Sequence, residues 1–295
     1  MDLTLPIEAP FSLQSVLRSH GWVQLAPFSA ETPYEAFTYT DQLAQGARVT
    51  FWTVQSVEEG VHVAVKGEVN AFEEAEIRSK LTRMLDLERD LAPFYTIAEQ
   101  EPKLSYMAER ARGRILRSAT LFEDIVKTIM TTNTAWSGTI RMVQALVDLY
   151  GRSLAEDPTR HAFPTPAELA APDVETLRRQ AKLGYRAPYV SELARRVDSG
   201  ELDLHALETS DLPTPLLRKQ LLAIKGVGAY AAANLLMLIG RTDYIPIDSY
   251  ALKVVSDEFH DGRPVKPADV EAAFERFGEW KGMAFWFWDY DGDEE

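Results

Sequence analysis

A short segment punctuated by glycines constrains this chain more than any other feature. Residues 221–251 read LLAIKGVGAYAAANLLMLIGRTDYIPIDSYA, which predicts an amphipathic helix, a tight turn and a second, apolar helix. Gly226 and Gly228 remove side chains where the backbone must turn sharply and approach a ligand closely. The turn also leaves free N–H groups at the start of the second helix, and such groups bind anions, phosphate above all. We therefore expect this hairpin to hold a phosphodiester backbone without regard to base sequence.

An aspartate follows the hairpin in a position suited to chemistry. Asp248 lies 18 positions after Tyr230, and Pro246 before it favours a sharp entry into a helix that Asp248 would cap. A capping aspartate is ordinary by itself, and a lone Gly-x-Gly turn is weak evidence. The hairpin and the aspartate together are far more specific than either feature alone.

This combination resembles the helix-hairpin-helix (HhH-GPD) DNA glycosylases, in the branch that holds the AlkA-type alkylpurine and 8-oxoguanine glycosylases. The family pattern is an apolar residue, a turn of the form x-Gly-apolar-Gly, a helix and a catalytic aspartate. The matching residues here are Ile224, Lys225-Gly226-Val227-Gly228 and Asp248. The resemblance implies that Lys225, Gly226, Val227 and Gly228 bind DNA. Lys225 stands where the family usually has proline and adds a positive charge close to the expected phosphate.

Further segments extend the resemblance over most of the chain from residue 113 onward. Residues 113–136 resemble the helix and loop that fill the hole left by an extruded base, with Asn133 as the gap-filling residue. Residues 183–190 resemble the segment in which Tyr185 would wedge beside the orphaned base and Arg186 would pair with it. Gly138 replaces the arginine with which the 8-oxoguanine branch reads an opposite cytosine. Taken alone, Asn133 would be an ordinary turn residue, and a Tyr-Arg pair in a loop is usually packing.

The chemistry can be argued from the residues. Breaking an N-glycosidic bond builds positive charge on the deoxyribose, which a nearby carboxylate stabilises in a dry site. A carboxylate can also orient or deprotonate the attacking water. Asp248 is our candidate for both tasks. Family members that also cut the strand use a lysine two positions after the second hairpin glycine, and here that position is Tyr230, which we place beside Asp248 in the catalytic set. The resemblance therefore implies base release without lyase activity.

The sequence determines the identity of the released base less closely than it determines the chemistry. The target must be flipped out of the duplex into a pocket, and Phe285 stands where the 8-oxoguanine branch has a base-reading glutamine. Electron-rich aromatic rings suit cationic alkylated purines such as 3-methyladenine, so we place Trp136, Phe285 and Trp286 in the base pocket. At least half of residues 285–288 should instead be core. The alternatives are an 8-oxoguanine or mismatch glycosylase on the same scaffold, or a non-catalytic DNA-damage-binding protein.

The periodicity predicts a mainly α protein with a small N-terminal antiparallel β-sheet, an α+β arrangement. Residues 1–75 form the predicted sheet domain and residues 76–295 the helical glycosylase body. Strands are predicted at 49–54 and 61–65, joined by a turn at 58–60, with further strands at 21–25 and 36–39. Helices are predicted at 12–19, from 71 onward, and at 121–130, 139–150, 166–170, 174–182, 188–199, 214–224, 229–238, 248–259 and 267–277.

The net charge of −14 is the main objection to DNA as a partner, because a uniformly acidic surface repels phosphate. The basic residues are clustered, however. Five lie between Lys103 and Arg117 against a single acid, and four lie between Arg218 and Arg241 with none. The acids gather at 68–76 and 289–295. We expect a basic groove on an acidic body, with strongly salt-dependent binding to double-stranded DNA that carries a damaged base.

Composition also bears on cofactors, membrane segments and localisation. The chain has no cysteine, which fits a reducing cytoplasm and excludes a cysteine-ligated iron–sulfur cluster. The five histidines are scattered, so no metal site is predicted. No apolar run is long enough to span a bilayer, and the N-terminus lacks the features of a signal peptide. We expect a cytoplasmic monomer, nucleoid-associated if bacterial. Its chemistry should need no cofactor, although the hairpin carbonyls and a phosphate could share a monovalent cation.

Overall fold

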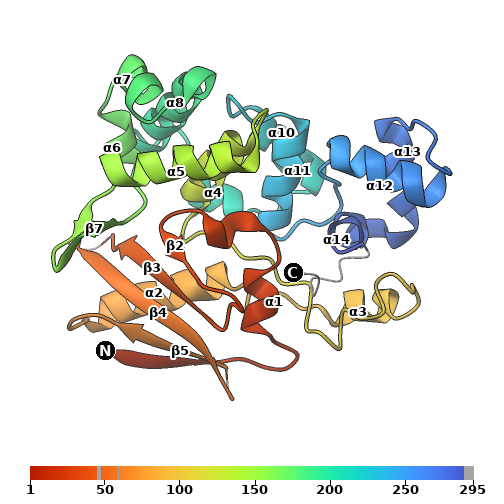
Figure 1. The fold of residues 1–295 in the computed structure, drawn as a ribbon, viewed down its shortest axis with the longest axis horizontal. Helices are drawn as coiled ribbons and strands as arrows, with labels where there is room; N and C mark the ends of the chain where they lie inside the picture. Colours follow the sequence, from red (N-terminus) through yellow and green to blue (C-terminus); the bar gives the residue numbers. More distant parts are fainter. Residues whose placement is uncertain (45–47, 59, 289–295) are drawn as a thin grey trace. The chain divides into compact units, whose positions relative to one another are not determined.

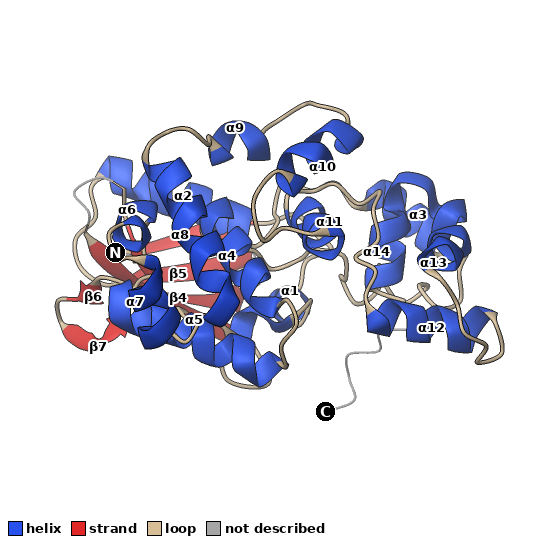
Figure 2. Cartoon of the chain, turned by 90° about the horizontal axis from the view of Figure 1, so that it is seen from above, coloured by secondary structure: helices blue, strands red, loops and turns tan. Residues whose placement is uncertain are grey.

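The computed structural model describes residues 1–44, 48–58 and 60–288, and the chain forms two compact units. Unit 1 comprises Met1–Arg89 and Glu109–Leu204, and unit 2 comprises Asp90–Ala108 and His205–Glu295. The predicted fold class is confirmed: helices predominate, and a small antiparallel sheet lies near the N-terminus (Figures 1 and 2). The predicted domain boundary near residue 75 follows the change from strands to helices and stays a prediction.

A five-stranded antiparallel sheet forms part of unit 1 (Figure 1). Its spatial order is β1-β5-β4-β3-β2. In β4, Trp52 and Val54 are fully buried while their sequence neighbours are not, because one face of the sheet covers a core. The strands are β1 (Asp2–Pro6), β2 (Phe28–Ser29), β3 (Ala36–Gln42), β4 (Val49–Val57) and β5 (Gly60–Val65).

The strand predictions were right in three of four places. Those at 36–39, 49–54 and 61–65 are confirmed, whereas the strand predicted at 21–25 is wrong. That segment is a short 3-10 helix, η1 (Gly21–Gln24), because Trp22 and Val23 both turn into the core instead of alternating between two faces. Residue 59 of the predicted turn lies outside the described residues.

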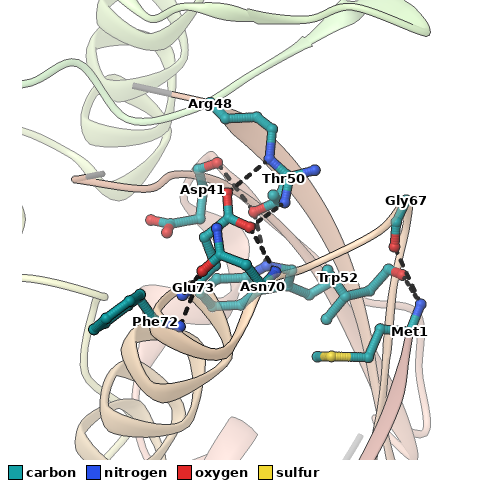
Figure 3. A network of polar contacts seen from close by, with 10 residues as sticks. Met1, Asp41, Arg48, Thr50, Trp52, Gly67, Asn70, Phe72 and Glu73 are labelled. Atoms are coloured by element: carbon teal, nitrogen blue, oxygen red, sulfur yellow. Dashed lines mark hydrogen bonds and ion pairs between the residues drawn. The ribbon is translucent and has the colours of Figure 1, made fainter. Parts of the chain in front are cut away.

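A network of polar contacts ties helix α2 (Ala71–Met84) to the sheet (Figure 3). Arg48 donates to both carboxylate oxygens of Glu73 at 3.0 Å. Asn70 caps α2 by accepting from the Glu73 N–H, and Glu73 accepts from the Asn70 N–H in return. Deeper in, Lys80 Nζ lies 2.7 Å from Asp41 Oδ2, and burial raises the pKa of Asp41 to about 6. These contacts fix α2 against β3 and the start of β4.

Helix α4 (Leu121–Thr131) is the central helix of unit 1, and its residues from Leu121 to Met130 are all buried. Its charged residues are paired. Glu123 accepts a hydrogen bond from Tyr39 Oη at 2.6 Å and lies 2.6 Å from Lys127 Nζ. Asp124 accepts from Trp22 Nε1 at 2.8 Å and lies 2.9 Å from Arg83. Burial alone would raise the pKa of Asp124, but Arg83 and these hydrogen bonds hold it below its usual value. The network fixes the helix that leads into Asn133.

The other elements of unit 1 are helices and one small hairpin. The predicted helices are confirmed to within a few residues at their ends, whereas the polar hairpin of β6 and β7 was not predicted. These elements are α1 (Leu13–Leu17), α5 (Trp136–Tyr150), β6 (Ser153–Leu154), β7 (Asp157–His161), α6 (Pro166–Ala170), α7 (Val174–Gln180), η3 (Gly184–Arg186) and α8 (Ala187–Asp198).

The regular elements of unit 2 are all helices in its described residues (Figure 2). An aromatic cluster that includes Phe259, Phe274 and Trp288 lies at its C-terminal end. Within the residues that the structure describes, no helix is both long enough and apolar enough to cross a membrane. The elements are α3 (Ala92–Ala98), α9 (Leu204–Glu208), which begins at the unit boundary, α10 (Thr214–Leu222), α11 (Ala229–Leu238), α12 (Ser249–Phe259), α13 (Pro267–Phe274), η4 (Glu275–Trp280) and α14 (Lys281–Trp286).

Acidification should weaken unit 1 through His20. Its ring contacts the Leu116 carbonyl at 2.6 Å, and burial lowers its pKa from 6.5 to about 4. Since the unfolded chain takes up the proton first, the stability that His20 contributes above pH 6.5 is lost as the pH falls toward 4. Between pH 7 and 5 we expect a loss of about 2 kcal/mol in unfolding free energy from this group.

The comparison variant is His20→Gln, which keeps a donor for the Leu116 carbonyl and does not titrate. The opposing titration of Asp41 is common to both proteins and cancels. Denaturant unfolding at pH 7 and pH 5 should show a shallower loss in the variant. Equal losses in the two proteins would mean that His20 is not held neutral by the fold.

Candidate active site

The predicted hairpin is present in unit 2 between α10 and α11. Ile224 and Val227 are 2% and 5% exposed, and the Val227 N–H donates to the Ile224 carbonyl at 3.0 Å. These two apolar side chains anchor the turn, while Lys225 and Gly228 lie exposed between and after them. Gly226 has a φ of +88°, a conformation that favours glycine.

Gly228 differs from our expectation. Its φ is −90°, and a Cβ atom placed there would meet nothing within 4 Å. The turn itself therefore does not need glycine at this position. The missing side chain instead leaves open the approach to the N-terminus of α11.

The N-terminus of α11 can bind an anion. Gly228 is its N-cap, no side chain caps the helix, and its first intrahelical hydrogen bond runs from the Ala232 N–H to the Gly228 carbonyl at 2.8 Å. The N–H groups of the first turn therefore lie at an exposed, positively polarised helix end. Lys225 is exposed in the same turn, so the hairpin offers both backbone donors and a cation to a phosphate.

Asp248 is exposed at the N-cap of α12. Its Oδ1 accepts a hydrogen bond from the Ala251 N–H at 2.9 Å, the only hydrogen bond to this carboxylate among the described residues. The helix thus fixes the orientation of the carboxylate through one oxygen and leaves the other for a reactant or a water.

Tyr230 lies in the first turn of α11 and is half-buried. Burial raises its pKa, and the negative charge of Asp248 raises it further, so the two side chains interact within unit 2. Asn234 Nδ2 donates to the Tyr230 carbonyl at 3.0 Å. Asn234 was not predicted, although an asparagine within a helix can bond the carbonyl four residues earlier. Tyr230 is therefore a neutral hydrogen-bond donor near a carboxylate.

Lys253 is the amine on α12 nearest in sequence to Asp248. Its Nζ lies 2.5 Å from Asp257 Oδ2, and this hydrogen bond raises the pKa of the amine. An amine that forms a Schiff base needs the opposite shift, because only the neutral form is a nucleophile. Asp257 therefore shifts the pKa of Lys253 away from the value that a Schiff-base amine needs.

The three aromatic residues predicted for the base pocket are divided between the two units: one lies in unit 1 and two lie in unit 2. In unit 1, Trp136 is 36% exposed, its Nε1 donates to Gln24 Oε1 at 2.8 Å, and its ring lies directly against Gly21. In unit 2, Phe285 is 8% exposed and packs edge-to-face on Phe274 at 5.6 Å, as a core residue does. Trp286 is half-buried. Their roles in a base pocket stay predictions, and Gln24 had no local sequence signal.

Unit 1 brings together Asn133, Tyr185 and Arg186. Asn133 Nδ2 donates to Tyr185 Oη at 3.3 Å, and the Arg186 guanidinium lies 4.5 Å from the centre of the Tyr185 ring. Both Tyr185 and Arg186 also donate to the Thr132 carbonyl. Thr132 was not predicted, because a carbonyl acceptor leaves no signal in the sequence.

The basic groove predicted over residues 103–117 does not form as expected. Arg112 is 4% exposed, Arg114 donates to the carbonyls of Asp86 and Arg89, and Arg117 lies 2.5 Å from the Asp86 carboxylate. These guanidinium groups serve the core of unit 1. Lys219 on α10 and Lys225 in the turn are exposed, and both stay candidates for contact with phosphate. The acidic residues 289–295 lie outside the described part.

No group of three or more His, Asp or Glu side chains in the described residues could hold a metal ion. The residues that converge in unit 2 are a carboxylate, a phenol and a set of backbone donors. Such a set can stabilise a cationic sugar, orient water and hold a phosphate.

The model of the HhH-GPD superfamily base excision DNA repair proteins matches residues 126–279, more than half of the chain. A probable N-glycosylase/DNA lyase of Methanothermobacter thermautotrophicus is 28% identical over 69% of this chain and 70% of its own length. A DNA-3-methyladenine glycosylase of Bacillus subtilis is 25% identical over 75% of this chain and 74% of its own length.

Among solved structures, the 3-methyladenine DNA-glycosylase from Archaeoglobus fulgidus has a similar fold. Its TM-score is 0.76 at 22% identity, and the match covers 99% of each chain.

Proposed function

Because this chain belongs to the HhH-GPD superfamily of base excision DNA repair proteins, we propose that it binds double-stranded DNA, flips out a damaged base and hydrolyses its N-glycosidic bond with Asp248. Membership makes it a DNA glycosylase of base excision repair. One observation is the main support for hydrolysis by Asp248. Asp248 holds an exposed carboxylate at a helix N-cap, and its charge acts on Tyr230, the residue two positions after the second hairpin glycine.

The proposed mechanism assigns each group a task. The hairpin N–H groups and Lys225 hold a phosphate, which carries no sequence information and so fixes the strand whatever the base. The Asp248 carboxylate stabilises the positive charge that grows on the deoxyribose as the bond to the base breaks. The same carboxylate orients or deprotonates the water that attacks that carbon. Tyr230 donates a hydrogen bond and provides no amine, so the product is a free base and an abasic site.

We further propose that the lesion is an alkylated purine such as 3-methyladenine. The Bacillus subtilis relative bears that specificity in its name. Phe285, which the resemblance places at the position of the base-reading glutamine, is a buried residue whose apolar side chain offers no hydrogen bond. Tyr230 and Trp286 are half-buried aromatic residues of unit 2, and such rings favour a cationic base.

The competing function is a glycosylase that also cuts the strand. The relative from Methanothermobacter thermautotrophicus, named a probable N-glycosylase/DNA lyase, supports it.

A panel of duplexes separates the candidate lesions: one duplex has an alkylated purine, one has 8-oxoguanine, one has a G·T mismatch and one is undamaged. We expect free base from the alkylated duplex. Release only from the 8-oxoguanine or mismatch duplex would favour those alternatives, and release from none would leave a non-catalytic DNA-damage-binding protein.

Strand cleavage is open to a direct test. Borohydride should trap no covalent adduct between this protein and lesion DNA, because Tyr230 occupies the lysine position and Asp257 raises the pKa of Lys253 instead of lowering it. The variant Tyr230→Lys supplies an amine at that position and serves as the positive control. An adduct formed by the unmodified protein, and lost in Lys253→Met, would show that Lys253 is the nucleophile and that the monofunctional assignment is wrong.

A further inference from the structure

A compact polar cluster in unit 1 consists of Thr132, Asn133, Tyr185 and Arg186, which we call the tip. Asn133 adopts a φ of +49°, which an asparagine tolerates better than most residues. Its side-chain amide donates to Tyr185 Oη at 3.3 Å, and that hydroxyl donates to the Thr132 carbonyl at 3.2 Å. Tyr185 is nevertheless 47% exposed. The hydroxyl end of the tyrosine is fixed while much of its surface remains accessible.

Arg186 stabilises this arrangement from a buried position. It is only 6% exposed, and one Nη donates to the same Thr132 carbonyl that Tyr185 uses. Its guanidinium lies 4.5 Å from the Tyr185 ring centre, and its other Nη lies 3.9 Å from Met142 Sδ. The guanidinium thus contacts a carbonyl, an aromatic ring and a thioether of its own unit.

A base-reading arginine needs the opposite arrangement. It must present two N–H groups side by side to the edge of a base. Arg186 has little accessible surface for this, and Gly138, at the position of the second reader in the 8-oxoguanine branch, has no side chain. A Cβ at Gly138 would lie 2.4 Å from Thr134 Oγ1, so the Thr134 hydroxyl occupies that position.

We propose that Arg186 is a positioning residue that fixes Tyr185 and Asn133, and that the protein consequently acts on its lesion with little regard to the base opposite. This inference rests on the proposed function. The tip enters the duplex as one pre-formed unit of an aromatic face and an amide. Neither group distinguishes one orphaned base from another, because stacking is available to every base.

The test measures affinity for duplexes that contain an abasic-site analogue opposite A, C, G or T. For the unmodified protein we expect the four dissociation constants to agree within about threefold, whereas a bidentate reader would separate them by roughly 5- to 150-fold. Arg186→Gln should weaken binding to all four duplexes by the same factor. Tyr185→Phe keeps the ring and removes the hydroxyl contacts. It should weaken all four, and the double variant should lose less than the product of the two single effects.

Two results would overturn the proposal. One is that the unmodified protein binds the duplex with one opposite base about tenfold or more tighter than the others, and that this preference disappears in Arg186→Gln. The other is unchanged affinity in both single variants with folding confirmed by thermal melting. If Arg186→Gln does not fold, Arg186→Lys and Tyr185→Phe carry the test. Because these affinities need no catalysis, failure of this inference can be told apart from failure of the proposed function, which the base-release panel measures.

Discussion

Replacing Asp248 with asparagine is expected to lower the single-turnover rate of base release by roughly 10²–10⁴-fold. The carboxylate acts on charge that exists only in the transition state, so its loss should affect chemistry and leave duplex binding unchanged or slightly tighter. The fold should survive, because asparagine caps helices as well as aspartate does and can accept the hydrogen bond from the Ala251 N–H.

The chain provides a matched control for this variant. Asp173 caps α7 in unit 1 in the same way, accepting a hydrogen bond from the Thr176 N–H at 2.7 Å. Asp173→Asn should therefore have the wild-type rate. A near-wild-type rate in Asp248→Asn, or an equal loss in both variants, would remove Asp248 from the chemistry.

Introducing a negative charge at the hairpin is expected to weaken binding to every duplex, damaged or not, by roughly tenfold or more at low salt. Gly228→Asp is the sharpest variant. Since Gly228 has a φ of −90° and open space at its Cβ, an aspartate fits there and can cap α11. Folding stability should be kept or slightly raised while DNA affinity falls.

Three companion variants separate charge from shape. Gly228→Ala adds a methyl group without charge and should weaken binding less than Gly228→Asp. Lys225→Glu should also weaken binding less, and should flatten the slope of log affinity against log salt by about one. Gly226→Ala strains a φ of +88° and should lower the melting temperature instead. Salt titrations in which Gly228→Asp and Lys225→Glu bind like the parent protein would show that the hairpin is only a structural turn.

The hairpin could be predicted because its signals are local. Glycines mark the turn, and the apolar spacing marks the helices on both sides, so α10, α11 and α12 were located to within two residues. Asp248 was predicted as a cap for the same reason. Its effect on Tyr230, 18 residues away, required the fold.

The remaining differences have tertiary causes. Residues 21–24 form a 3-10 helix whose Trp22 is held by Asp124, a partner 102 positions away. Helix α4 was predicted to bury one apolar face, but it also buries Lys127, because Glu123 is present one turn earlier to pair with it. The arginines at 112–117 looked like a DNA-binding surface by composition, whereas the fold uses their charges in its own core. A charge count in sequence does not show which charges already have partners.

The most direct test of the proposed function counts two products in one reaction. A duplex with a single alkylated purine is incubated with the parent protein or with Asp248→Asn, and free base and strand breaks are quantified together before and after alkali. We predict free base in amounts equal to the alkali-labile sites, no breaks before alkali, and neither product from Asp248→Asn. Free base accompanied by equal numbers of breaks before alkali, or no free base from the parent protein, would contradict a hydrolytic glycosylase that depends on Asp248.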